Sequence, residues 1–313
     1  MPDKSTKFSI VTPCYNEEEN VELLYNKVKE VFSQLGENDY EHIFIDNAST
    51  DNTVKILKSI AREDKNLKII VNSRNFGHIR SPFYGLLQGS GDAVIFLASD
   101  LQDPPGMIKD FILKWKEGYK IVLGVKKESK ESRWMFSVRK LFYNLIGAIS
   151  EIDHIKNFTG FGLYDKKIIQ ILRNIDDPYP YFRGLVCDIG FEIFTIEFVQ
   201  PARKKGITKN NFYSLYDMAM LGITNHSKVP LRLATMLGFL AALSSFFVAV
   251  VYLIYKVIFW QSFTVGTAPI VIGLFFFSAV QLFFIGIIGE YIGSIHTQVL
   301  KRPLVIEKER INF

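Results

Sequence analysis

The sequence predicts an α/β domain with a doubly wound, mostly parallel sheet, followed by a membrane part of two helices. Strand and helix patterns alternate over roughly the first hundred residues, which is typical of α/β folds. Beyond Arg232 lie only five of the 37 Lys and Arg residues and three of the 32 Asp and Glu residues. That C-terminal part holds two long uncharged stretches, so a polar domain precedes an apolar one.

The polar part is expected to begin with a buried strand over residues 8–13 and a helix over residues 17–35, with Asn16 as the N-cap. Further strands are predicted over 42–46, 67–72 and 93–98, and further helices over 52–63 and 79–89. Such repeated steps favour parallel strands with helices on both faces. Ligands of these sheets bind beyond the carboxyl ends of the strands, so the functional residues are expected there.

The apolar part holds 23 uncharged residues over 233–255 and 33 over 257–289, the second run interrupted by polar residues near its start. A bilayer core needs about 20 apolar helical residues, so spans are predicted near 233–256 and 268–290. Two buried helices of a soluble core are disfavoured, because such helices are rarely apolar on every face. Basic residues flank the pair on its outer sides, which predicts an integral membrane protein with both termini cytoplasmic.

Three regions are therefore expected: a cytosolic domain over 1–210, a juxtamembrane region over 211–232, and the hairpin with a cytosolic tail over 233–313. Residues 211–225 have an amphipathic pattern that suits a helix at the membrane interface or one packed on the polar domain. The chain enters its first strand almost at once, so no signal peptide is expected.

Composition and motifs exclude several classes of protein. Cys14 and Cys187 are too few and too far apart for a disulfide scaffold or a zinc ribbon. The first strand is not followed by Gly-x-Gly-x-x-Gly, and the chain has no P-loop motif, which argues against dinucleotide and P-loop sites. No nucleic-acid partner is expected.

Carboxylates and amides follow three of the predicted strands, beginning at Pro13, Asp46 and Ser99. Oxygen ligands of this kind suit Mg²⁺ or Mn²⁺, which keeps waters and bridges to a substrate diphosphate. Asp100 is the predicted metal ligand, with Gln102 and Asp103 close by, and Asp46 is placed to accept hydrogen bonds from a base or ribose.

Motifs along nearly the whole chain carry a family resemblance. They are Pro13-Cys14-Tyr15-Asn16-Glu17-Glu18, Asp46 with Ser49-Thr50-Asp51, Arg74-Asn75-Phe76-Gly77-His78, Asp100-Leu101-Gln102-Asp103-Pro104-Pro105, Phe182-Arg183-Gly184, Arg203-x-x-Gly206-x-Thr208-Lys209, Pro230-Leu231-Arg232, Gly289-Glu290-Tyr291-Ile292-Gly293 and Arg302-Pro303. By the order and spacing of these motifs, the chain resembles the family 2 glycosyltransferases of the polyprenyl-phosphate type. This group includes the bactoprenol glucosyltransferases and the dolichol-phosphate mannose synthases.

The resemblance implies a GT-A fold and an inverting transfer of one sugar from a nucleotide donor, UDP-glucose by default, to undecaprenyl phosphate with Mg²⁺ or Mn²⁺. It implies donor binding by Pro13, Tyr15, Asn16, Glu18, Asp46, Ser49, Arg74, Asn75, Gly77 and Gln102. Asp100 and Gln102 would hold the metal, and Arg183, Arg203 and Lys209 the acceptor phosphate, so that Asp100, Arg203 and Lys209 carry catalysis. Whether the chain forms a homo-oligomer stays open.

Two departures from the family pattern affect the mechanism. Ala98 stands where the first carboxylate of an Asp-x-Asp motif is expected, and Gly160 and Gly162 stand where relatives carry an aspartate and an arginine. A phosphate monoester is largely a dianion at pH 7, because its second pKa is about 6, so the acceptor needs orientation more than deprotonation. Asp165 and Asp188 are weaker substitutes for the missing base.

Two alternative functions remain on sequence grounds. A processive polysaccharide synthase would need a Gln-x-x-Arg-Trp motif and more spans, whereas here Gln170-Ile171-Leu172-Arg173 is followed by Asn174. A non-catalytic sugar-nucleotide-binding membrane protein is suggested by Ala98 and Gly160.

Overall fold

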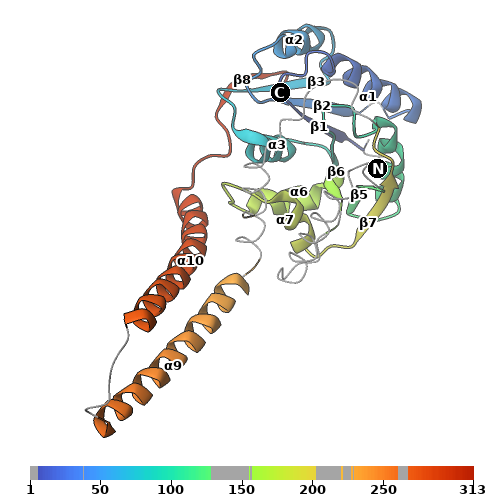
Figure 1. Ribbon diagram of the computed structural model, residues 1–313. Helices are drawn as coiled ribbons and strands as arrows, with labels where there is room; N and C mark the ends of the chain where they lie inside the picture. Colours follow the sequence, from blue (N-terminus) through green and yellow to red (C-terminus); the bar gives the residue numbers. More distant parts are fainter. Residues whose placement is uncertain are drawn as a thin grey trace.

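The structure is a computed structural model that describes residues 6–37, 39–127, 155, 157–201, 220, 227, 229–259 and 267–313. In it a polar α/β domain is joined to two long helices that extend away from it (Figure 1). Most of the juxtamembrane region predicted over 211–232 lies outside the described residues.

One mixed sheet of eight strands forms the centre of the domain, in the order β7-β5-β6-β4-β1-β2-β3-β8. Its parallel centre consists of β1 (Phe8–Cys14), β2 (Tyr40–Asp46), β3 (Leu67–Asn72) and β4 (Ala93–Phe96). Beside β4 lie β6 (Phe158–Asp165), which is antiparallel to it, then β5 (Ile121–Lys126) and β7 (Ile193–Phe198).

Helices cover both faces of this sheet, as the sequence predicts. One apolar core joins the sheet to α1 (Val21–Leu35), α2 (Thr53–Glu63) and α4 (Ile108–Lys116), the last preceded by the 3₁₀ turn η1 (Pro105–Met107). A second core on the other face joins it to α3 (Gly77–Leu87), α6 (Lys166–Asn174) and α7 (Phe182–Asp188). The predicted α/β class is therefore confirmed.

The sequence placed the start of the first helix too early. Helix α1 begins at Val21, and Asn20 is its N-cap residue. Asn16 has a φ of 54°, outside the helical region, and bonds to the loop after β2. The N-cap assigned to Asn16 is therefore wrong, because the four residues after it belong to the loop at the sheet edge.

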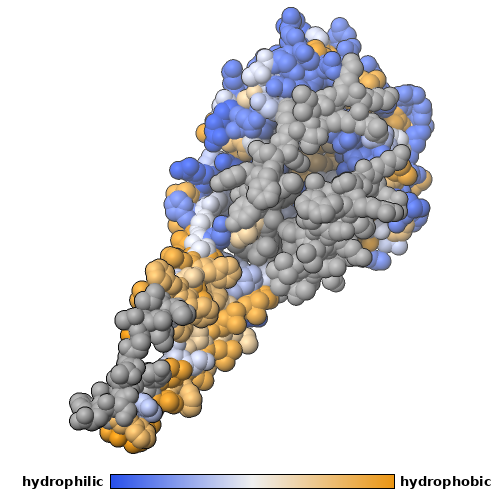
Figure 2. Space-filling view, viewed as in Figure 1, coloured by the Kyte–Doolittle hydropathy of each residue, from blue (hydrophilic) through white to orange (hydrophobic). Residues whose placement is uncertain are grey.

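Two helices are long and apolar enough to cross a membrane: α9 (Val229–Ile258) and α10 (Thr267–Leu300). None of the residues in their most apolar windows is buried, which separates them from core helices of a soluble protein. Figure 2 shows their apolar side chains exposed along the stem, in contrast to the hydrophilic surface of the domain. Helix α10 continues ten residues past the span end predicted near 290.

After α10 the chain returns to the domain and forms β8 (Glu307–Ile311), which pairs antiparallel with β3 at the edge of the sheet. The sequence indicated only a cytosolic tail there. The Asn312 side-chain amide closes the contact by donating to the carbonyls of Ala61 and Leu67 at 2.7 and 2.8 Å. The far end of the hairpin is thus attached to the same domain as its near end.

Candidate active site

The candidate site lies where β1, β2, β3 and β4 end together. Their register aligns Cys14 with Asp46 and Asp46 with Val71, so the loops that follow these strands share one edge. Three residues other than glycine with a positive φ lie in those loops: Asn16 (54°), Ala48 (63°) and Leu101 (58°). Such backbone strain is uncommon and gathers at functional sites.

The loops after β1 and β2 are bonded to each other. The backbone N–H of Asn16 donates to Ser49 Oγ at 2.8 Å, and the side-chain Oδ1 of Asn16 accepts from Thr50 N at 2.8 Å. Glu18 Oε2 accepts from the backbone and side-chain nitrogens of Asn52, both at 2.9 Å. Asn16 and Glu18, predicted as donor-binding residues, therefore hold this part of the edge in shape, and Pro13 and Tyr15 lie half-buried beside them.

Asp46 is fully buried at the end of β2. Ser49 satisfies both of its oxygens, since Ser49 N donates to Oδ2 at 2.9 Å and Ser49 Oγ donates to Oδ1. Burial raises the pKa of Asp46, and the hydrogen bonds from Ser49 oppose that rise. The contacts seen here make Asp46 an anchor of the loop that carries Ser49.

Asn47 is the residue at this edge that the sequence analysis missed. Its Oδ1 accepts from Phe76 N at 2.9 Å and from Asn72 Nδ2 at 3.2 Å. Its Nδ2 donates to Asn75 Oδ1 at 2.9 Å and to Gly77 O at 3.1 Å. The buried amide thus joins the end of β2 to the loop after β3. The sequence feature that could have identified Asn47 is its position directly after Asp46, the last residue of β2.

The loop after β3 presents a cation at the same edge. The Arg74 guanidinium lies 4.0 Å from the centre of the Phe76 ring and donates to Asn75 O at 3.0 Å. Gly77 has a φ of +84° and starts α3, with its N–H donating to Asn75 Oδ1 at 2.8 Å. Arg74 is exposed, so its charge is accessible to solvent at this edge.

The loop after β4 carries Asp100, half-buried, whose Oδ1 accepts from Gln102 N at 3.1 Å. Asp103 lies buried behind it and accepts from Ala98 N at 3.4 Å. Burial raises the pKa of Asp103 to about 6, with Lys126 opposing the rise and the charge of Asp100 adding to it. Two carboxylates therefore lie close together at the end of β4.

These carboxylates fit a hard cation that takes most of its ligands from elsewhere. No group of three His, Cys, Asp or Glu side chains with metal-binding spacing occurs among the described residues. Mg²⁺ typically uses one or two carboxylates, several waters and substrate phosphates instead of an all-protein cage. Asp100 matches that requirement, and Gln102 contributes a backbone contact to it.

Gly160 lies in β6 with a φ of +105°, and a Cβ there would be 3.5 Å from the rings of Phe96 and Phe182. A Cβ at Gly162 would come within 2.5 Å of Val122 O, so no side chain fits there unless β5 shifts. The arginine that the family resemblance implies at this position is thus excluded by the backbone of the neighbouring strand.

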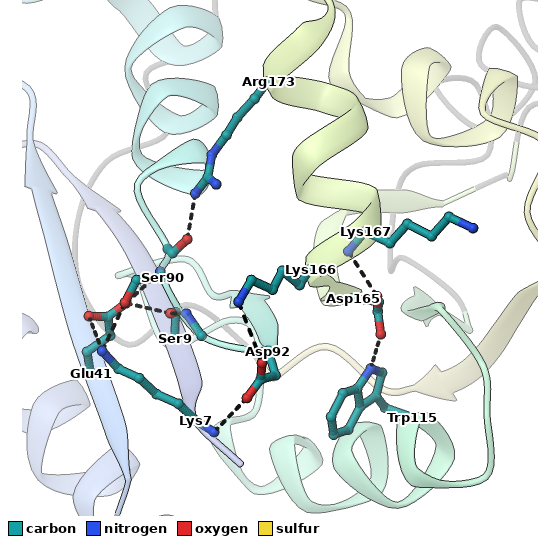
Figure 3. Close-up of polar contacts among 12 residues, drawn as sticks. Lys7, Ser9, Glu41, Ser90, Asp92, Trp115, Asp165, Lys166, Lys167 and Arg173 are labelled. Carbon is teal, nitrogen blue, oxygen red and sulfur yellow. Dashed lines mark hydrogen bonds and ion pairs between the residues drawn. The ribbon is translucent and has the colours of Figure 1, made fainter. Parts of the chain in front are cut away.

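Asp165 is not available as a substitute base. It pairs with Ala93 at the beginning of β4, so it lies at the opposite edge of the sheet. Its carboxylate accepts from Lys167 N at 2.9 Å and from Trp115 Nε1 at 2.8 Å (Figure 3). It also accepts from Lys120 Nζ at 2.9 Å. Asp165 therefore caps α6 and anchors α4. Asp188, the other substitute, is exposed at the end of α7.

Of the predicted acceptor-phosphate residues, Arg183 lies half-buried in α7, beside a pocket that also borders Phe96 and Phe182. Arg203 and Lys209 lie outside the described residues. Asp100, Arg74 and the loop anchors thus follow strands that end at one edge of the sheet, and Arg183 lies in α7 beside the pocket.

Comparison with known proteins agrees with this architecture. Residues 9–176 match the Glycosyl transferase family 2 domain, and residues 229–295 match the GtrB C-terminal hairpin. The chain is 36% identical to the uncharacterised glycosyltransferase YkcC of Bacillus subtilis (strain 168), over 96% of this chain and 93% of that protein. It is 33% identical to the SfII prophage-derived bactoprenol glucosyl transferase of Shigella flexneri, over 97% and 98%.

Among solved structures, glucosyl-3-phosphoglycerate synthase of M. tuberculosis covers 70% of this chain and 78% of its own, with 18% identity and a TM-score of 0.46. That distant likeness carries no argument about the site. The family is shown by the family 2 domain, which covers more than half of the chain, and by relatives above 30% identity over nearly its full length. The chain belongs to glycosyl transferase family 2 and is a glycosyltransferase.

Proposed function

We propose that this glycosyltransferase moves one sugar, glucose from UDP-glucose, to undecaprenyl phosphate at the cytoplasmic face of the membrane, with inversion at the anomeric carbon. The observation that carries the proposal is the attachment of both ends of a two-helix hairpin to a family 2 domain. A lipid acceptor explains why β8, which follows the second long helix, pairs with β3 of the catalytic domain. The names of the bactoprenol glucosyl transferases among the relatives support the same acceptor.

The proposed reaction makes one bond and breaks another. A phosphate oxygen of the acceptor attacks the anomeric carbon, and the bond from that carbon to the diphosphate breaks, so that UDP leaves with the electron pair. The acceptor phosphate is mostly a dianion at pH 7 and needs no protein base. This agrees with Gly160 and with the remote position of Asp165.

In this proposal the side chains bind and orient. Asp100 holds a Mg²⁺ or Mn²⁺ ion, which supplies charge neutralisation for the leaving diphosphate. Arg74 adds a fixed positive charge beside the donor, held in place by the Phe76 ring. Arg183, Arg203 and Lys209 orient the acceptor phosphate, in which a guanidinium grips two oxygens and an ammonium acts as a point charge.

The proposed topology places the α/β domain and β8 in the cytoplasm, with a short external turn between α9 and α10. Two crossings return the chain to its starting side, as the pairing of β8 with β3 requires. The basic residues at the outer ends of the hairpin favour the cytoplasm for that side. We therefore keep the division into a catalytic domain over 1–210, a juxtamembrane region over 211–232 and a membrane hairpin from residue 233, but β8 of the predicted tail joins the catalytic domain.

The test uses the full-length protein in lipid vesicles with radiolabelled UDP-glucose and undecaprenyl phosphate. The expected product is a lipid-linked monosaccharide whose formation stops in EDTA and resumes with Mg²⁺ or Mn²⁺. GDP-mannose serves as the matched donor control. A polymer would indicate a processive synthase, and the absence of any product with intact donor binding would indicate a sugar-nucleotide-binding protein. Full activity in EDTA would refute the metal assignment.

A further inference from the structure

A small apolar pocket lies between α3 and α7 on one face of the sheet. Its volume is about 100 Å³. Apolar side chains from α3, β4 and α7 form most of its wall: Ile79, Pro82, Phe83, Leu86, Phe96 and Phe182. An engineered cavity of about 150 Å³ holds a benzene ring, so this pocket has room for a group of about five carbons.

The pocket adjoins the reaction site. Two of its wall residues, Phe96 and Phe182, are also the side chains nearest to Gly160. Phe96 ends β4, and Asp100 follows four residues later. Four extended residues span at most about 14 Å, so the pocket and the predicted metal ligand are neighbours on one sheet edge.

The pocket also adjoins the membrane hairpin. The stretch of residues 180–183 lines it, and the residues just before this stretch contact the end of α10. Gln298 Nε2 donates to Asp177 Oδ1 at 2.8 Å, and Lys301 pairs with Asp176 at 3.1 Å. In Figure 1, α6 and α7 lie on the side of the domain nearest to the two long helices.

The lining of the pocket is not entirely apolar. His78 and Arg183 line the pocket together with its apolar residues. A sugar would leave most of its hydroxyls without partners against such a wall, and a buried hydroxyl without a hydrogen bond is unfavourable. An apolar group joined to a phosphate satisfies both parts of the lining.

We infer that this pocket binds the first isoprene unit of the lipid acceptor, with the phosphate at the Arg183 end of the pocket and the sugar-accepting oxygen directed toward the sheet edge. The inference deepens the proposed function and rests on it. It identifies Ile79 and Phe182 as positioning residues for the acceptor, whose contact with the first five carbons would fix the phosphate in line with the donor.

The test compares acceptors that differ only in their hydrocarbon. Full-length protein is supplied with UDP-glucose and either ethyl phosphate or dimethylallyl phosphate, which carries one isoprene unit. Burying three extra carbons favours dimethylallyl phosphate by at least about 10-fold in kcat/KM. Ile79→Trp fills the pocket and should reduce that preference to less than 2-fold while the KM for UDP-glucose is unchanged.

Two further variants keep the test decisive. Thr159→Trp blocks the same pocket from an exposed position on β6, so it does not depend on repacking α3. Leu87→Trp adds the same bulk to α3 at a half-buried residue that does not line the pocket, and should keep the wild-type preference. An undiminished preference in both Ile79→Trp and Thr159→Trp would overturn the inference.

Calorimetry separates this inference from the proposed function. Dimethylallyl phosphate should bind the wild-type protein and bind Ile79→Trp at least about 10-fold more weakly. If no phosphate accepts a sugar but this difference in binding is found, the proposed function fails and the pocket assignment stands. Equal binding by wild type and both blocked variants refutes the pocket whatever the transfer assay shows.

Discussion

Gly160→Ala and Gly160→Asp together test whether the enzyme works without a protein base. The φ of +105° at Gly160 lies outside the regions that residues with a Cβ normally occupy, at a cost of about 1–3 kcal/mol. The nearest atoms would be 3.5 Å from the new Cβ, so steric overlap adds little. Alanine also lowers the conformational entropy of the unfolded chain, which offsets about 0.4–1 kcal/mol of this backbone cost. The expected net loss for Gly160→Ala is about 1–2 kcal/mol.

Gly160→Asp has the same backbone cost and adds a carboxylate between the rings of Phe96 and Phe182. Burial there would raise the pKa of the new carboxyl, and any ionised fraction would repel the acceptor phosphate. The Asp variant should therefore transfer sugar no faster than the Ala variant. In the wild type the rate should rise with pH through about 6 and then level, following the second ionisation of the phosphate.

Urea unfolding and initial rates between pH 5 and 8 provide the measurements, and Gly118→Ala is the matched control. Gly118 has a φ of +115°, a Cβ there would meet no atom within 4 Å, and the residue lies in the turn after α4. Gly118→Ala should lose about as much free energy of unfolding as Gly160→Ala, while its rate of sugar transfer per folded molecule stays at the wild-type value. A Gly160→Asp rate at least about 10-fold above that of Gly160→Ala would refute the self-activated phosphate and restore a carboxylate base.

Four other predictions concern charge and the edges of the sheet. Burial opposes ionisation of Glu41, but hydrogen bonds from Lys68, Ser9 and Ser90 lower its pKa to about 2. Figure 3 shows Glu41 beside Ser9 and Ser90. Relative to an unfolded value near 4.5, the lowered pKa of Glu41 stabilises the fold by up to about 3 kcal/mol above pH 4.5, and this stabilisation is lost as the pH falls toward 2. Urea unfolding of Glu41→Gln at pH 7 should show the same loss of stability. Asp165→Asn should lower the melting temperature but leave UDP-glucose affinity within about 2-fold, and calorimetry showing lost donor binding would contradict its position. Asp100→Asn should reduce turnover at least about 100-fold at saturating Mg²⁺, whereas an unchanged rate would exclude it as a metal ligand. Deletion of residues 307–313 should weaken UDP-glucose binding, because it releases β3 and the Arg74 loop; unchanged calorimetry would refute that coupling.

The site edge was predictable because strand ends leave a local trace in the sequence. Apolar runs that stop at polar residues located the ends of β1, β2 and β4, and parallel connections required those ends to meet. Asp165 shows where that reasoning fails. It lies five residues beyond Gly160, and at about 3.3 Å per residue an extended strand carries it about 17 Å, to the other edge of the sheet. Only the antiparallel direction of β6 reveals this, and direction is set by tertiary pairing.

Strand β8 escaped prediction for a related reason. Glu307-Lys308-Glu309-Arg310 has the composition of a solvated tail, and nothing local indicates a partner more than 230 residues earlier in the chain. Its charges suit an edge strand, which must not pair with other molecules. Tyr84 donates to Glu307 at 2.8 Å, and Lys58 pairs with Glu309, so the side chains recognise α3 and α2 individually.

The position of β8 has a mechanical consequence for a transfer reaction at a membrane. Strand β3 carries the Arg74 loop at its carboxyl end and β8 along its side, where Ser73 N donates to Ile306 O at 2.9 Å. Six residues join β8 to the end of α10, and Arg80 donates to Pro303 O within that link. The Arg74 loop and helix α10 are therefore connected by one short, bonded segment. In the proposed reaction the lipid phosphate stays at the bilayer surface, so the donor would have to be held at a fixed height above it, and the contacts of this segment would supply that constraint.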